Sequence, residues 1–173
     1  IAGCSVAYHL AKFGWKDVVL LERDQLTSGT TWHAAGLLGQ IGASATITKL
    51  RNYSLNLYKE LEKETGIATG LKQNGSLTIA TTNERLEELK RQATFAQRFN
   101  IEVDSLDKEQ IKDIYSLINV DDIVGGIFMP GDGQADPVGI TNVLAKSAKM
   151  YGAKIFEHCS VNKILTKNGL IEG

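Results

Sequence analysis

The sequence predicts an α/β fold in which a nucleotide-binding domain is interrupted by an α+β segment. A helical pattern over residues 1–13 is followed by a short apolar run at 18–21, an order typical of a parallel α/β sheet. The run ends in an acid, Glu22, and then enters a loop rich in Thr, Ser and Gly. From about residue 67 the pattern changes to alternating strands and helices, and a further helix begins near residue 136.

The first helical pattern combines small residues with a few large apolar ones. We expect Ile1, Val6, Leu10 and Phe13 to form the face that packs on a flat surface. Gly3 stands about 20 residues before an acid, which is the spacing between the third glycine of a G-x-G-x-x-G fingerprint and its ribose-binding acid. The other interpretation is an ordinary α/β unit in which Gly3 only allows close packing of the helix.

The segment after this helix suits a dinucleotide. Residues 18–21 are predicted to be a buried strand, and a fixed carboxylate at its end can accept hydrogen bonds from two ribose hydroxyls. The loop at 28–31 offers backbone N–H groups and hydroxyls to a pyrophosphate. His33 then stands about where the reactive end of a dinucleotide would lie.

Three helices and a hairpin are predicted over the middle of the chain. An amphipathic helix is expected at 46–65, and Asn74–Gly75 predicts a tight hairpin turn before a strand at 76–80. A second helix is expected at 83–99, and a short third helix should end at Tyr115. The inward residues expected on the first two helices are Leu50, Tyr53, Leu57 and Leu61, then Leu86, Leu89, Ala93, Ala96 and Phe99. The capping boxes expected before the last two helices are Thr81 with Glu84 and Asp107 with Gln110.

The last part of the chain should return to the first domain. A strand is expected at 123–129, and Asp136 as N-cap with Pro137 at the first helical position predicts a helix. Further strands are expected at 153–157 and 160–166, followed by a hairpin turn at residues 167–169. We therefore assign 1–66 and 134–173 to the nucleotide-binding domain, and 67–133 to an inserted α+β segment.

Composition narrows the class of partner. The net charge is −1 and the pI is near 6.4, so neither nucleic acid nor a membrane surface is an expected partner. Cys4 and Cys159 form no CxxC pattern and are expected to be reduced, buried thiols; no metal site is expected. The chain begins with Ile inside a helical pattern, so we expect a segment of a longer protein, truncated at both ends.

Two strings carry a resemblance to a known family. Leu21–Glu22–Arg23 and SGTTWHAAGL at 28–37 resemble the dimethylglycine and sarcosine dehydrogenases, which are flavoproteins of the D-amino-acid-oxidase-like superfamily. GSLTIATTNERLEEL at 75–89 and GDGQADP at 131–137 agree with it. The resemblance implies a Rossmann-like FAD-binding domain, of the glutathione-reductase and D-amino-acid-oxidase type, with an inserted α+β piece of the substrate domain.

The resemblance also implies roles for single residues. His33 would bond covalently to FAD, Glu22 would bind the adenosine ribose, Arg23 would lie beside the adenine, and Val161 would meet the adenine edge through its backbone. The alternatives are that His33 is a buried structural histidine, that Glu22 is a capping or surface acid, and that Val161 is a core valine. Trp32 could simply pack under the flavin. The expected cofactor-binding residues are Gly3, Glu22, Arg23, Ser28, Gly29, Thr30, Thr31, Trp32, His33, Ala34, Ala35, Gly36, Leu37 and Val161.

The implied reaction is oxidation of an N-methyl amine such as dimethylglycine or sarcosine, with hydride transfer to flavin N5. Electron-transfer flavoprotein or oxygen would accept the electrons, and tetrahydrofolate could take the one-carbon unit in longer relatives. No catalytic residue is assigned, because the substrate ligands are expected beyond residue 173. The alternatives are a non-catalytic relative, like the regulatory subunit of pyruvate dehydrogenase phosphatase, and an NAD-dependent dehydrogenase. The expected location is the cytoplasm in a bacterium or the mitochondrial matrix in a eukaryote.

Overall fold

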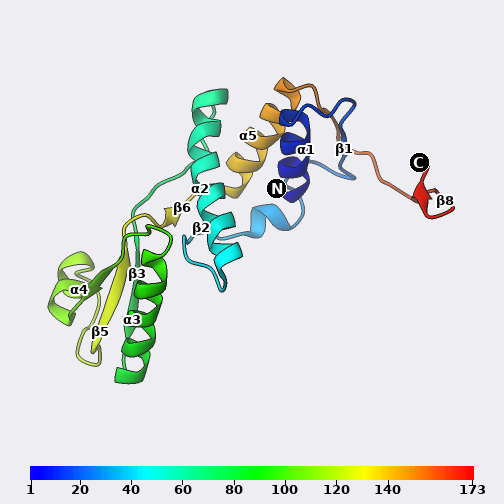
Figure 1. The fold of residues 1–173 in the computed structure, drawn as a ribbon. Helices are drawn as coiled ribbons and strands as arrows, with labels where there is room; N and C mark the ends of the chain where they lie inside the picture. The colour runs from blue at the N-terminus through cyan, green and yellow to red at the C-terminus, as the bar shows by residue number, and fades with distance from the viewer. The chain divides into compact units, whose positions relative to one another are not determined.

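The computed structural model describes residues 1–173 and divides into two compact units (Figure 1). The first unit contains Ile1–Gly36, Lys59–Gly70 and Asp136–Gly173, and the second contains Leu37–Tyr58 and Leu71–Ala135. The long helix α2 (Ala45–Thr65) contributes to both. This division places residues 37–58 in the second unit, whereas the sequence analysis placed them in the nucleotide-binding domain. Assigning the units to FAD-binding and substrate-binding domains stays a prediction.

The first unit is built on a parallel pair of strands. β1 (Val19–Leu21) pairs with β7 (Lys154–Phe156), with Leu20 opposite Ile155. Helix α1 (Ala2–Lys12) packs against α5 (Pro137–Met150) and β1, and α5 packs against β7 (Figure 1). The remaining elements are the 3₁₀ helix η1 (Thr30–His33) and the short hairpin β8 (Thr166–Lys167) and β9 (Leu170–Ile171).

Three small residues and one tyrosine, and not the predicted apolar residues, form the packed face of α1. Cys4, Ala7, Tyr8 and Ala11 are its buried residues. Phe13, together with Val6, was predicted to face the core, but these side chains are 74% and 59% exposed. The predicted face was wrong because small side chains allow α1 to approach α5 closely, and this close approach decides which face is buried.

Two strand predictions in this unit also need correction. Residues 18–21 were expected to be fully buried, but Val19 and Leu21 are about half exposed, since alternate residues of β1 point away from the side on which α1 packs. The strand expected at 160–166 does not form over 160–165, and only Thr166 belongs to a strand, as the first residue of β8. The turn prediction is confirmed, because Asn168 and Gly169 both have positive φ and join β8 to β9.

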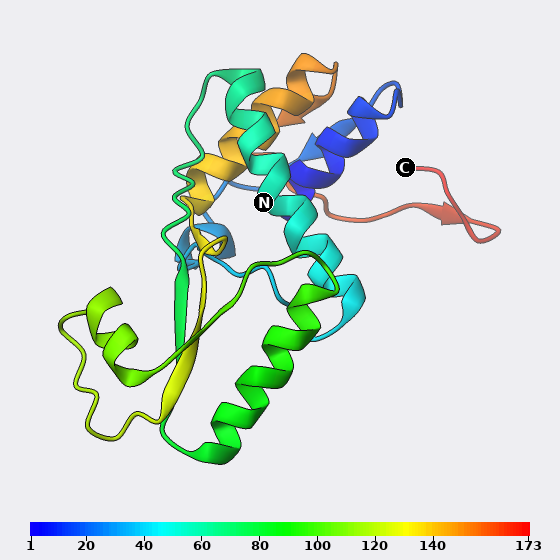
Figure 2. The ribbon, with the colours of Figure 1, turned by 60° about the vertical axis from the view of Figure 1, so that its left-hand side comes forward.

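The second unit is organised around an antiparallel sheet of order β3–β5–β4. These strands are β3 (Ser76–Ala80), β4 (Asp104–Leu106) and β5 (Gly125–Met129). Helices α3 (Asn83–Gln97) and α4 (Lys108–Ile114) pack on opposite faces, as Figure 2 shows, because adjacent glycines of β5 face Leu86 of α3 and Ile111 of α4. The core on the α3 side contains Ala80, Leu89, Ile127 and Met129.

The local start signals of the helices are mostly confirmed. Asp107 and Gln110 make both bonds of the capping box at α4, and the Asp136 side chain accepts the Val138 N–H at 3.0 Å ahead of α5. The cap of α3 is Thr82 and not Thr81, since the Thr82 hydroxyl accepts the Arg85 N–H. Either threonine could serve chemically, and the chain direction leaving β3 selects the second.

The hairpin prediction failed because the pairing partner is distant in sequence. Asn74–Gly75 does not join a hairpin, since β3 pairs with β5 and Lys72 bridges to Gln134 of β6 (Gly133–Gln134).

The predicted face of α2 was correct only at its buried Leu57 and Leu61. Leu50 and Tyr53 are 57% and 49% exposed, whereas Thr48 and Leu55 are buried. None of the helices combines the length and the apolar character needed to cross a bilayer.

Candidate nucleotide-binding site

A cavity of about 390 Å³ lies in the first unit, where the amino end of α1 meets the carboxyl end of β1. The carboxyl ends of parallel strands are where α/β folds bind nucleotides. Five of the predicted cofactor-binding residues line it: Gly3, Glu22, Gly29, Thr30 and Thr31. Residues more than 20 positions apart in sequence are therefore brought together in one place.

The amino end of α1 faces this cavity. Ile1 N donates a hydrogen bond to Thr31 Oγ1 at 3.0 Å, which joins the start of the helix to η1. Free N–H groups and the helix dipole at such an end favour an anion. A Cβ at Gly3 would lie 3.5 Å from Leu20 Cδ1, an ordinary contact, so packing inside the chain does not require glycine here. The position suits close approach of a ligand better than the packing alternative.

The Glu22 carboxylate is held in a fixed place. Its backbone N–H donates to Phe156 O at 2.9 Å, and its carbonyl accepts Cys159 N–H at 2.8 Å. Its Oε1 accepts the Asp24 N–H at 3.0 Å, which orients the half-buried carboxylate at the cavity wall. A fixed acceptor of this kind suits a pair of ribose hydroxyls.

Glu157 is a residue that the sequence analysis missed. Its Oε1 accepts the Leu26 N–H at 2.7 Å, and the adjacent His158 N–H donates to Asp24 O at 2.8 Å. These bonds tie the loop after β1 to the end of β7. A signal was present in the sequence, because Glu157 ends a predicted strand much as Glu22 ends the apolar run at 18–21, and parallel strands end at the same edge of a sheet.

The stretch at 28–37 continues from the loop that lines the cavity, and the residues at the centre of this stretch are exposed. Thr30 to His33 form η1, and the rings of Trp32 and His33 lie 4.2 Å apart at an angle of 36°. His33 is exposed, which disagrees with the alternative of a buried structural histidine. Ala34 and Ala35 are exposed as well, and Gly36 has a φ of +73°, a conformation that favours glycine.

Several predicted residues lie outside the cavity lining. Arg23 is 78% exposed and pairs with Asp24 at 3.4 Å. Val161 is 57% exposed and belongs to no strand, which disagrees with the alternative of a core valine and with the strand expected there. Ser28 donates its hydroxyl to Gln25 O at 2.8 Å. The remaining predicted residues outside the lining are Trp32, His33, Ala34, Ala35, Gly36 and Leu37. Their cofactor roles stay predictions.

The residues that line the cavity fit the adenosine and pyrophosphate part of FAD. The volume of the cavity, about 390 Å³, lies in the range of small-molecule pockets. Glu22 supplies a carboxylate for the ribose, the amino end of α1 and the threonines supply donors for phosphate, and a Cβ at Gly29 would meet no atom within 4 Å. The cavity lining therefore suits part of a dinucleotide.

Comparison with known proteins identifies the family. The family described as FAD dependent oxidoreductase (DAO) matches residues 1–173, so the chain belongs to this family. The mitochondrial sarcosine dehydrogenase of Homo sapiens is 44% identical over 94% of the chain and 18% of its own length. The mitochondrial dimethylglycine dehydrogenase of Rattus norvegicus is 45% identical over 87% of the chain, and again 18% of its own length.

Two further relatives help to place the chain. The mitochondrial pyruvate dehydrogenase phosphatase regulatory subunit of Mus musculus is 38% identical over 100% of the chain and 20% of its own length. Among solved structures, L-proline dehydrogenase from P. horikoshii has a TM-score of 0.90 at 28% identity, over 98% of this chain and 45% of that one. The chain spans about a fifth of the length of these curated relatives.

Proposed function

We propose that the protein is a flavin-dependent dehydrogenase that oxidises an N-methylated amino acid such as sarcosine or dimethylglycine. One observation carries the proposal: Gly3, Glu22 and the loop at 29–31 line a single cavity, immediately before the exposed TWHAAG string. The family is FAD-dependent, and relatives named for these two substrates are 44–45% identical to the chain.

The chain's own residues have distinct roles in this proposal. Glu22 holds the ribose, and the amino end of α1 with Thr30 and Thr31 holds the pyrophosphate. His33 forms the covalent bond to FAD, for which its exposure on η1 is suitable. FAD, when bound, supplies the acceptor for the hydride of the N-methyl carbon.

The partners follow from the same chemistry. The substrate is a small N-methylated amine, and the electrons pass to electron-transfer flavoprotein or to oxygen. Tetrahydrofolate takes the one-carbon unit if the full-length protein has a folate-binding domain. The sarcosine and dimethylglycine dehydrogenases named above are mitochondrial proteins, which supports the matrix in a eukaryote; a bacterial protein would act in the cytoplasm.

A regulatory relative is the second candidate, because the phosphatase regulatory subunit matches the whole chain. The lower identity of 38% and the histidine in the TWHAAG string favour the dehydrogenase. The NAD-dependent alternative was wrong, since the family is FAD-dependent.

The test is the colour of the full-length protein after acid precipitation. A covalent flavoenzyme keeps its yellow colour in the pellet, and His33→Ala should release the flavin to the supernatant. His158→Asn is the matched control, because Asn tolerates the positive φ of +56° at that exposed position. A colourless wild-type protein would favour the regulator, and flavin retained in the His33→Ala pellet would contradict the attachment at His33.

A further inference from the structure

In the second unit, the backbone of residues 39–42 is held by side chains from other parts of the chain. We refer to these residues as the clamped segment. Asp132 accepts the Gln40 N–H at 2.7 Å, and the Thr48 hydroxyl accepts the Gly42 N–H at 3.0 Å. The segment's carbonyls are bound too: Asn52 Nδ2 donates to Gln40 O, and Arg51 Nη1 donates to Ile41 O. Side chains thus take the role that a neighbouring strand would have.

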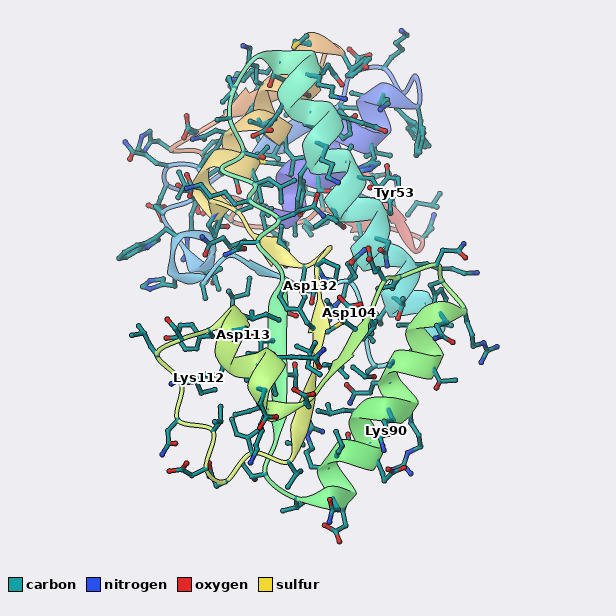
Figure 3. All side chains as sticks on the ribbon, turned by 90° about the vertical axis from the view of Figure 1, so that its left-hand side faces the viewer. Tyr53, Lys90, Asp104, Lys112, Asp113 and Asp132 are labelled. Atoms are coloured by element: carbon teal, nitrogen blue, oxygen red, sulfur yellow. The ribbon has the colours of Figure 1, made fainter.

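Asp132 is the buried member of this arrangement. Asp132 is 3% exposed and lies between β5 and β6 (Figure 3). Oδ1 accepts the Gln40 N–H, and Oδ2 accepts the Ser76 hydroxyl at 2.7 Å. A buried carboxylate is tolerated only when its oxygens are hydrogen-bonded, and bonds to a charged acceptor are the strong ones. Asp132 therefore ties the clamped segment to the first residue of β3.

Close packing leaves the clamped segment little freedom. A Cβ at Gly42 would overlap the side chain of Ile47, and a Cβ at Gly131 would overlap the Gln40 amide. Gly75, which donates its N–H to Asp132 O at 3.0 Å, has no room for a Cβ against the ring of Phe128. The glycine pair around Asp132 and the glycine at 42 thus let three backbone segments meet.

The clamped segment comes just after the string at 28–37, and its residues help to line two cavities. It follows β2 (Leu37–Leu38), which is the end of the string at 28–37. Leu37, Leu38 and Gly39 line a cavity of about 540 Å³ in the second unit, whereas Ile41, Gly42 and Ala43 line another of about 490 Å³. A shift of the segment would therefore move one wall of each cavity and the end of the string that contains His33.

We propose that Asp132 is a positioning residue for the flavin: by holding residues 39–42, it fixes the point at which the His33 string ends. This inference rests on the proposed function, because only there is the string assigned to the flavin. Asp132 acts through the backbone of Gln40 and touches no reacting atom. Nothing in the capping or strand patterns around GDGQADP requires an acid at this position, and the two bonds of the buried carboxylate explain it.

The experiment uses the full-length holoprotein and four variants. Asp132→Ala removes both bonds, whereas Asp132→Asn keeps an oxygen for Gln40 N–H and an amide for Ser76. Ser76→Ala removes one bond only. Asp104→Ala is the matched control, an exposed aspartate on β4 of the same unit (Figure 3). Each variant is measured for the fraction of flavin attached after acid precipitation, for the visible absorption and circular dichroism of the bound flavin, and for its melting temperature.

We expect Asp132→Ala to lower the rate of covalent attachment about tenfold to a hundredfold, because a small misplacement costs this much in a reaction that depends on orientation. The flavin spectrum should shift in the same variant. Ser76→Ala should show a smaller change in the same direction, Asp132→Asn should recover most of the wild-type behaviour, and Asp104→Ala should match wild type.

Several outcomes would overturn the inference. If Asp132→Ala melts earlier but its flavin spectrum and attachment match wild type, Asp132 is structural only. If Asp132→Ala does not fold, Ser76→Ala decides, and an unchanged flavin spectrum there overturns the proposal. A yellow wild type with these results leaves the proposed function intact, whereas a wild type that binds no flavin overturns both.

Discussion

At the scale of single residues, the Glu22 carboxylate is the group most directly fixed for a ligand. We expect Glu22→Gln in the full-length apoprotein to weaken FAD binding about tenfold to a hundredfold, since a hydrogen bond to a charged acceptor contributes about 1.5–3 kcal/mol. A titration of flavin fluorescence during reconstitution measures the affinity. Lys16→Gln is the control, because that side chain is exposed and lies outside the cavity. An equal loss in Lys16→Gln would contradict a specific role for Glu22 in binding FAD.

Burial should protect the thiol at the wall of the same cavity. Cys4 is 2% exposed, and its burial raises the pKa of the thiol above the ordinary value. Since the thiolate is the reactive form, Cys4 should be alkylated by iodoacetamide at neutral pH much more slowly than the half-buried Cys159. Mass spectrometry of single-cysteine variants over time gives both rates. Equal rates in the folded protein would contradict the buried position of Cys4.

Tyr8 should make the first unit sensitive to alkali. Burial raises the pKa of Tyr8, although Lys12 Nζ donates to its hydroxyl at 2.7 Å and opposes that shift. A pKa raised by folding stabilises the protein below the unfolded value of about 10, and this contribution is lost as the pH rises through the folded value. The melting temperature should therefore fall above about pH 10.

Comparison of melting curves between pH 8 and 11 for wild type and Tyr8→Phe tests this alkaline effect. The Phe variant should show a smaller fall with pH. Only part of the fall should disappear, because burial also raises the pKa of Tyr58. Identical slopes in the two proteins would assign the alkaline transition to other groups.

At the scale of elements, local signals were predicted well and distant pairings were not. The caps at Asp107 and Asp136 depend on groups within a few residues, so their pattern is visible in the sequence. The partner of β3 is β5, almost 50 residues away, and no local pattern distinguishes that pairing from a hairpin at Asn74–Gly75. Only packing could show that Tyr8 and three small residues form the buried face of α1.

In the candidate site too, residues with local signals were predicted and residues held by distant bonds were not. Gly3, Glu22 and the loop at 29–31 could be predicted as parts of one site, because the spacing from Gly3 to Glu22 matches part of a dinucleotide fingerprint and the loop is rich in Gly and Thr. Glu157 and Asp132 were not predicted. Their bonds to backbone N–H groups span 131 and 92 residues, and such bonds leave no periodicity in the sequence.

The capping box of α4 gives a test at this scale. Asp107→Ala removes the acceptor of the Gln110 N–H, and we expect a loss of about 1 kcal/mol in the free energy of unfolding. Asp113→Ala is the matched control: it is an exposed aspartate in the last turn of the same helix, where the dipole disfavours an acid. Urea unfolding followed by circular dichroism measures both. A larger loss in Asp113→Ala than in Asp107→Ala would contradict the cap assignment.

At the scale of the whole molecule, the two units differ in how their sheets are covered. The sheet of the second unit has helices packed on both faces. In the first unit, Val19, Leu21 and Phe156 are about half exposed on the parallel pair β1–β7. Parallel sheets are normally covered on both faces, and two strands alone are marginally stable. The second unit should therefore be the more stable part of residues 1–173.

Native-state hydrogen exchange on residues 1–173 tests this difference. The amides of β5 should be the most protected, because it is the central strand of its sheet, and those of β1 and β7 should exchange faster. Adding FAD to the full-length apoprotein should slow exchange in β1 and in the loop after it and leave β5 unchanged, since a ligand stabilises only the state that binds it. Equal protection of β1 and β5 without FAD would contradict the ranking of the two units. Slower exchange in β5 alone on adding FAD would move the cofactor site away from Glu22.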